Sequence, residues 1–184
     1  MDSEPDDLTE FDPKDDVPGR TIKDALRDHE LVLVPPQEVH LQPEHLRIVQ
    51  LITSPIGFGH VDLLPVKALA EQDPQRGHVL FAVPFRSKDT RGLSPEFLAG
   101  WLSSLRVQRA MRRELDPARQ RDTLSMAKVE RLPGDFPDAD RCLQIATRWT
   151  DYERVKAFAD RLPAALTEWR LHLADEVEDP PARD

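Results

Sequence analysis

Apart from Arg112, six cations follow one another at short intervals between residues 106 and 128 of this 184-residue chain. Side chains of this type neutralise phosphates, and each phosphate neutralised releases counterions, so that binding weakens steeply with salt. Gln108 and Gln120 lie beside them, and glutamine forms paired hydrogen bonds with adenine. The pattern therefore favours contact with a nucleic acid. The six cations are Arg106, Arg109, Arg113, Arg119, Arg121 and Lys128.

A second cationic group, Arg86, Lys88 and Arg91, lies in a polar segment shortly before the first. We expect both groups to contribute to one basic surface. The alternative is an ordinary solvated face, because acidic residues are interspersed with these cations and surface charges commonly pair with one another. The acids nearest to the first group are Glu114, Asp116 and Asp122.

The first group needs a helix to align it, and the sequence predicts one over residues 94–115. Ser94 is a favoured N-cap residue, and Pro95 suits the first helical position. Spacings of three and four place the apolar side chains on one face, with three arginines in a row along its edge. Arg112 falls on the apolar face itself, so we expect the helix to bend, fray or end there. The apolar face holds Phe97, Leu98, Trp101, Leu102, Leu105 and Leu115.

The residues before this helix predict a small sheet. Residues 31–34, 46–52 and 78–85 are β-rich or alternating runs bounded by prolines, glycines or polar residues. The run 78–85 is nearly all apolar, so we expect it to be buried on both faces. Residues 21–27 predict a short helix, and residues 61–70 are compatible with either a strand or a helical turn. The expected fold class is α+β, with a small mixed or antiparallel sheet and packed helices.

From residue 138 to about 177 the apolar side chains recur at steps of three and four, which is close to a heptad repeat. We therefore expect a long helical arm with a partner helix along its apolar seam. Pro163 lies inside this stretch and removes a backbone donor, which predicts a kink or two abutting helices. Ile145, Val155 and Ala159 belong to the seam. The residues expected to contact the partner are Trp149, Tyr152, Leu162, Leu166, Trp169 and Leu173.

Charge divides the chain into a central part and two acidic ends. The formal net charge is −9, of which residues 1–16 carry −7 and residues 172–184 carry −4, leaving +2 for the rest. Segments rich in acid and poor in apolar residues favour disorder. We expect disordered tails at 1–16 and 178–184, a recognition-type domain over 17–137 and the arm over 138–177.

Four short motifs occur in a recognisable order. A leucine-rich helical segment (98–104) precedes a Leu-Ser pair (124–125), a proline-bounded strand (132–137) and a Gln-Ile-Ala sequence (144–146) near the start of the long helix. Over residues 75–175 this order resembles the second half of a target-recognition domain from the DNA-specificity subunits of type I restriction–modification systems. The chain departs from that family in the turn after the first helix, where Asp116 to Arg119 stand in place of a glycine.

This resemblance implies a target-recognition-domain-like fold that binds double-stranded DNA. It equates the arm with the family's spacer helix, which packs on a second spacer helix and on methyltransferase subunits. The implied partners are thus double-stranded DNA and either a DNA methyltransferase subunit or a second copy through the C-terminal helix. The length fits one recognition domain plus one spacer, which is half of a full specificity subunit.

The sequence offers little for catalysis. It has no asparagine, and neither Pro-Pro pair forms the Asn/Asp-Pro-Pro-aromatic motif of an adenine methyltransferase. Cys142 is the single cysteine, which excludes a disulfide framework and a multi-cysteine zinc site, and we expect it to be a small core side chain. His40 and His45 do not stack on one helix face. We predict no catalytic residues, metal or cofactor.

No run of 18 apolar residues occurs in the sequence, so we expect no membrane span and a cytoplasmic protein. Our interpretation is a non-catalytic, sequence-specific DNA-recognition subunit that directs a partner methyltransferase or restriction complex. Two alternatives remain. One is a regulatory interaction subunit that has lost DNA binding, which the negative net charge favours, and the other is a small enzyme with an unrecognised site.

Overall fold

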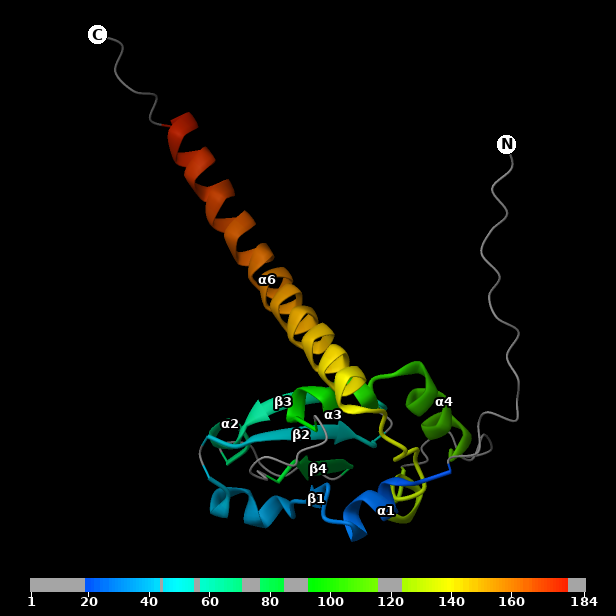
Figure 1. Cartoon of the computed structure of the whole chain (residues 1–184). Helices are drawn as coiled ribbons and strands as arrows, with labels where there is room; N and C mark the ends of the chain where they lie inside the picture. The colour runs from blue at the N-terminus through cyan, green and yellow to red at the C-terminus, as the bar shows by residue number, and fades with distance from the viewer. Residues whose placement is uncertain are drawn as a thin grey trace, which may run out of the picture.

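The computed structural model describes residues 19–43, 45–54, 57–70, 77–84, 93–115 and 124–178, with the backbone alone for residues 70 and 167–178. The tails expected at 1–16 and after residue 178 lie outside these ranges. Within them the protein is a mixed α/β structure with a small antiparallel sheet and a long C-terminal helix (Figure 1). The predicted fold class is confirmed at this level.

Four strands form the sheet in the order β1-β4-β2-β3, with every neighbouring pair antiparallel. β2 and β3 are consecutive and pair as a hairpin, whereas β4 inserts between β1 and β2. Residues 61–70 satisfy both predicted readings, because they hold a strand followed directly by a helical turn. The strands are β1 (Val32–Leu33), β2 (Arg47–Ile52), β3 (Val61–Pro65) and β4 (His78–Ala82).

Both faces of the sheet are covered, because side chains alternate along each strand. Leu63, Val49, Phe81 and Leu33 are register partners across all four strands, and they face the larger core. Ile48, Leu80 and Ala82 face a smaller cluster on the other side. This confirms that the described part of the run 78–85 is buried on both faces. The smaller cluster is closed by the 3-10 helix η2 (Pro36–Leu41) and by α2 (Val66–Ala70).

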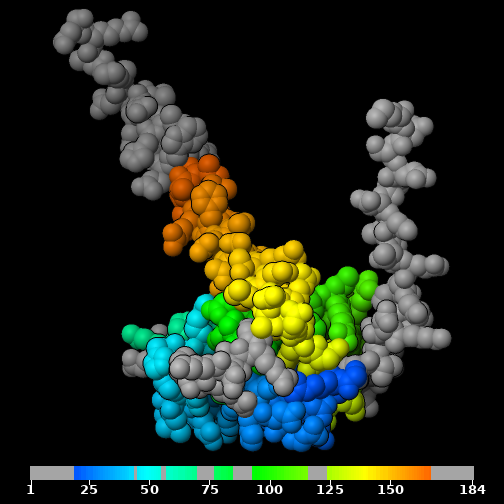
Figure 2. All heavy atoms as spheres, viewed as in Figure 1, coloured from blue at the N-terminus to red at the C-terminus, as the bar shows by residue number. Residues whose placement is uncertain are grey.

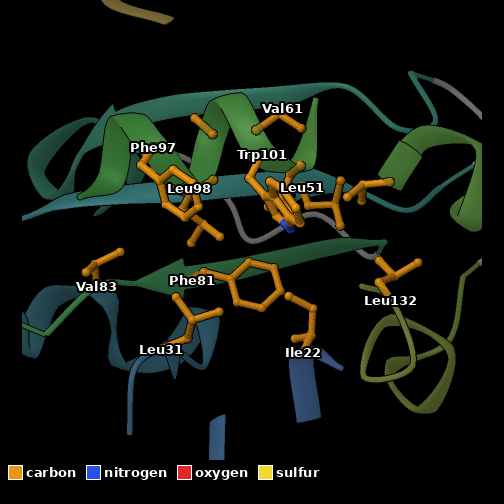
Figure 3. Packing of buried hydrophobic residues seen from close by; sticks show 14 of the residues in the cluster. Ile22, Leu31, Leu51, Val61, Phe81, Val83, Phe97, Leu98, Trp101 and Leu132 are labelled. Carbon is orange, nitrogen blue, oxygen red and sulfur yellow. The ribbon is translucent and has the colours of Figure 1, made fainter. Parts of the chain in front are cut away.

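The larger core lies under helix α3 (Pro95–Leu102). Figure 3 shows Phe97, Leu98 and Trp101 reaching from α3 toward Phe81 of β4. Further side chains complete this cluster from the N-terminal segment and from the segment before the long helix. They include Ile22, Leu31 and Leu132.

The predicted helix over residues 94–115 is two helices, α3 and α4 (Leu105–Arg113). The break has a local cause, because Ser104 is extended (φ −64°, ψ 148°) and its hydroxyl accepts a hydrogen bond from the backbone N–H of Val107. A second N-cap therefore restarts the helix in a new direction. The prediction of one apolar face along residues 94–115 is wrong at Leu105, whose side chain is 64% exposed.

Helix α1 (Ile22–Arg27) begins at the N-cap Thr21, as predicted, and lies beside the segment that follows α5 (Met126–Val129). The strand predicted at 132–137 is wrong, because a single bridge between Thr21 and Pro133 is all that forms there. Prolines at both ends of that segment lack the N–H that a ladder requires. Gly134 instead allows close approach, since a Cβ there would overlap the carbonyl of Thr21.

Helix α6 runs without a break from Ala139 to Glu178, with Pro163 inside it. The alternative of two abutting helices is therefore wrong, and in the view of Figure 1 the axis shows no sharp turn. The first part of α6 packs on α3. Beyond that contact the helix projects away from the body, as the space-filling view shows for residues up to 166 (Figure 2).

Candidate binding surfaces

Helix α4 separates its apolar and cationic side chains onto opposite faces. Val107 and Met111 are fully buried in the larger core. Arg109, Arg112 and Arg113 are exposed, and at about 100° per residue they lie on the side opposite the buried pair. The result is a short helix that presents three guanidinium groups to solvent. Arg112, which the sequence placed on the apolar face, belongs to this cationic face because α4 is rotated relative to α3.

Arg106 does not belong to the same exposed face, although the sequence placed it in the row. Its Nη2 is 2.8 Å from Oδ2 of Asp135, and its guanidinium carbon lies 5.9 Å from the centre of the Trp101 ring. The indole N–H of Trp101 in turn donates a hydrogen bond to the carbonyl of Pro133. Arg106 therefore joins α4 to the segment before α6 and contributes to the body's own structure.

Replacing Arg106 by glutamine is therefore expected to lower the free energy of unfolding by about 1 kcal/mol, because the Asp135 ion pair and the contact over Trp101 are both lost. Urea denaturation of Arg106→Gln measures this change, with Arg112→Gln, an exposed position on the same helix, as the matched control. We expect the control to differ from wild type by less than about 0.5 kcal/mol. Equal losses in the two variants would contradict a structural role for Arg106.

The acids near the cations only partly match the predicted pairing. Glu114 accepts a hydrogen bond and ion pair from Arg131, and this hydrogen bond is the main cause that raises the pKa of Arg131 above its usual value. Lys128 lies on α5 and is partly exposed. The other predicted members of the basic surface lie outside the described residues, as do Asp116 and Asp122. They are Arg86, Lys88, Arg91, Arg119 and Arg121.

The base of α6 is fixed to α3 by close packing. Cys142 and Trp149 are buried in the larger core, and Ile145 packs against it. Gly100 on α3 makes this approach possible, because a Cβ there would lie 2.7 Å from Cγ2 of Ile145. Trp149 is 8% exposed, so its predicted place on the partner-binding face is wrong and it anchors the arm instead.

Burial also decides the chemistry of Cys142. Desolvation raises the pKa of its thiol to about 11, with a smaller contribution from the negative charge of Asp138. The thiol therefore stays protonated at neutral pH and is a poor nucleophile. Its side chain is directed to the carbonyl of Pro137, at 3.4 Å. The prediction of a small core side chain is confirmed.

Ion pairs extend the attachment of the arm by one further turn. Arg47 on β2 bridges two helices, with Nη1 2.8 Å from Glu96 Oε1 on α3 and Nη2 3.2 Å from Glu153 Oε2 on α6. Lys156 Nζ lies 3.6 Å from Oδ1 of Asp62 on β3. These contacts hold α6 over the β2–β3 edge of the sheet as far as Lys156, and residues 157–166 beyond it are all exposed.

From Tyr152 onward α6 carries an exposed apolar stripe, which begins beside the last contacts with the body and continues beyond them. Exposed fractions run from 44% at Leu162 to 69% at Phe158. At about 100° per residue the centre of the stripe lies roughly 120° around the helix from the side chains that face α3. Trp169 and Leu173 continue it by position, with only their backbone described. Phe158 is absent from the seam predicted from the sequence, because it lies one residue before the heptad position that Ala159 occupies. The exposed stripe consists of Tyr152, Val155, Phe158, Leu162 and Leu166.

No protein-family model matches the chain, and no curated protein or solved structure is similar to it at a significant level. Among the described residues, no three histidine, cysteine or acidic side chains lie close enough together to hold a metal ion. In the same part of the chain, none of the helices combines the length and apolar character that crossing a membrane requires.

Proposed function

We propose that this protein is a non-catalytic DNA-recognition subunit that directs a partner DNA methyltransferase or restriction complex to its target. In this proposal the body has a target-recognition-domain-like fold and binds double-stranded DNA through α4 and neighbouring cations. The arm packs against another helix, supplied by the catalytic chain or by a second copy. The sequence resemblance described above supports both assignments.

The exposed stripe of α6 is the observation that carries this proposal. Residues 152–166 present five large apolar side chains to solvent, and contiguous apolar surface of this kind marks an interaction site. The spacing of three and four matches a helical partner. From Val155 onward the stripe turns away from α3, so a partner helix can lie along that part without meeting the body to which α6 is attached.

The cationic face of α4 supports the DNA-binding half. Arg109, Arg112 and Arg113 lie on a helix whose opposite face is fixed in the core. Because the core holds the helix in place, less conformational entropy is lost when its charges bind along a phosphate backbone. Phosphate contacts position a protein on DNA, whereas sequence is read at base edges. Gln120, which lies outside the described residues, remains a candidate for the second task.

The arm is tested by changing the stripe without changing the helix. Leu162→Glu with Leu166→Glu should abolish association of the chain, either with a second copy or with a co-expressed DNA methyltransferase subunit, because charge enters the apolar seam. The matched control is Ala157→Glu with Ala164→Glu, which adds the same charges to exposed positions on the other side of α6. Sedimentation velocity measures both. Association that survives in the stripe variant would contradict the proposal.

A second candidate function is a regulatory interaction subunit that does not bind DNA. The observation that favours it is Arg106, which is committed to Asp135 and Trp101 rather than to solvent. The net charge of −9 also disfavours contact with a polyanion. Under this alternative the stripe variant still loses its partner, whereas arginine variants of α4 have no effect on complex formation or function.

A further inference from the structure

A cavity of about 320 Å³ lies where the arm leaves the body. Three separate parts of the fold line it: the β2–β3 turn, the junction of α3 with α4, and α6. It is the size of a site for a small planar group rather than for a whole ligand of drug size. Its lining includes Gly59, His60, Ser103, Gln108, Trp149 and Tyr152.

The cavity wall is fixed by hydrogen bonds. Gln108 Nε2 donates to the carbonyl of Gly59 at 2.8 Å and to the carbonyl of Leu102 at 2.9 Å. Both amide hydrogens of Gln108 are thereby used, and its Oε1 keeps its acceptor capacity. Gly59 has φ +76°, and a Cβ at that position would overlap the amide of Gln108. Glycine is thus required for this wall on two counts.

Trp149 contributes its ring to the lining of this cavity. Its Nε1 is buried and has no hydrogen-bond partner among the described residues, and a buried donor without a partner is costly. The Trp149 ring also pairs with Tyr152, with centroids 5.2 Å apart and planes inclined by 45°. The cavity therefore offers an aromatic wall, of which Tyr152 is the exposed part.

The charges around the cavity favour a ligand with a neutral part inside the cavity and an anionic group outside it. His60, which pairs with Asp62 at 3.0 Å, is the one histidine among the lining residues that the structure describes, and these include no lysine, arginine or carboxylate. Arg112 is exposed one helical turn from Gln108 on α4, and residues four apart lie on neighbouring surface of a helix. A neutral heterocycle in the cavity would thus have a guanidinium nearby for its phosphate.

We propose that this cavity binds an unpaired nucleobase whose phosphate lies against α4. The base stacks on the exposed Tyr152 ring, beside Trp149, and donates a hydrogen bond to Gln108 Oε1. The proposal rests on the proposed function for the path of the DNA backbone along α4. The same cavity chemistry suits the base of a free nucleotide, so the test separates the two sources.

The experiment compares the affinity of the full chain for a duplex with one unpaired base and for the fully paired duplex, by fluorescence anisotropy. Stacking of one base is worth about fivefold to a hundredfold in affinity, so the duplex with the unpaired base should bind at least fivefold more tightly. Tyr152→Ala should bring the ratio close to one, because it removes the exposed ring of the wall. Leu143→Ala, an exposed apolar position on α6 outside the cavity, should retain it.

A second measurement follows quenching of tryptophan fluorescence by nucleoside monophosphates, with Trp149→Phe as the reference. If neither duplex binds but a monophosphate quenches wild type and not Trp149→Phe, the DNA-binding proposal fails and the cavity remains a site for a free nucleotide. Equal affinities for the two duplexes would overturn the proposal for a base within DNA. Absence of quenching together with no preference between duplexes would overturn it for both sources. Thermal unfolding confirms that each variant is folded.

Discussion

Replacing Arg109, Arg112 and Arg113 together by glutamine is expected to lower the affinity for duplex DNA by about two to three orders of magnitude near 0.1 M salt. The three side chains share the solvent face of α4, opposite the buried Val107 and Met111. Each lost phosphate contact should also reduce the slope of log affinity against log salt by about one, so the slope should fall by about three. Anisotropy titrations at several salt concentrations measure both quantities.

A control must separate the effect of the chain's net charge from the effect of where the three arginines lie. The matched control neutralises Arg27, Arg148 and Arg161, which are exposed on α1 and α6 away from α4. It removes the same three charges and should change affinity by a small factor only, because long-range attraction is screened within about 10 Å at 0.1 M salt. If the control loses as much affinity as the α4 variant, the binding is a response to total charge and α4 has no special part.

Gly100→Leu is expected to lower the free energy of unfolding by about 3 kcal/mol or more, because it forces a large side chain into the contact of α3 with α6. A Cβ alone would stand 2.7 Å from Ile145 Cγ2 and 3.4 Å from the Ile145 carbonyl oxygen. The same pressure should weaken the Arg47–Glu153 ion pair, since both depend on α6 lying close to the body. Urea denaturation measures the loss.

The smaller change Gly100→Ala separates the effect of packing against α6 from the effect of helix propensity. In a helix without tertiary contacts this change would stabilise by about 1 kcal/mol, so net destabilisation identifies packing as the dominant effect. Ile145→Ala removes the methyl group that the new Cβ meets. The double variant should therefore be more stable than the sum of the single changes predicts. Additive effects would show that Gly100 and Ile145 do not oppose one another.

Local signals in the sequence were sufficient for much of the fold. Thr21 and Ser94 mark the starts of α1 and α3, and alternating apolar residues give β2 within one residue. The long helix follows from its spacing, with bounds close to those observed. The break at Ser104 also had a local signal, a second capping serine, but the surrounding helix pattern outweighed it. These features depend on residues that are close in sequence.

The candidate sites were harder to predict, because they depend on contacts between distant residues. Arg106 meets Asp135 across 29 positions, and Arg47 meets Glu153 across 106. No spacing rule assigns such partners, so Arg106 looked like a surface cation. The seam of the arm was largely identifiable from its repeat, yet only the packing of Trp149 on the body shows where anchoring ends and the exposed stripe begins. The residues that line the cavity at the base of α6 are separated in the sequence, so they form no continuous motif.

The most direct test of a DNA-recognition subunit is the affinity of the wild-type chain for duplex DNA, measured across salt concentrations with its helical partner present. The account predicts binding in the micromolar range or tighter near 50 mM salt, with log affinity falling linearly as log salt rises. Folded protein that assembles with its partner through α6 but shows no DNA binding at that low salt would contradict it.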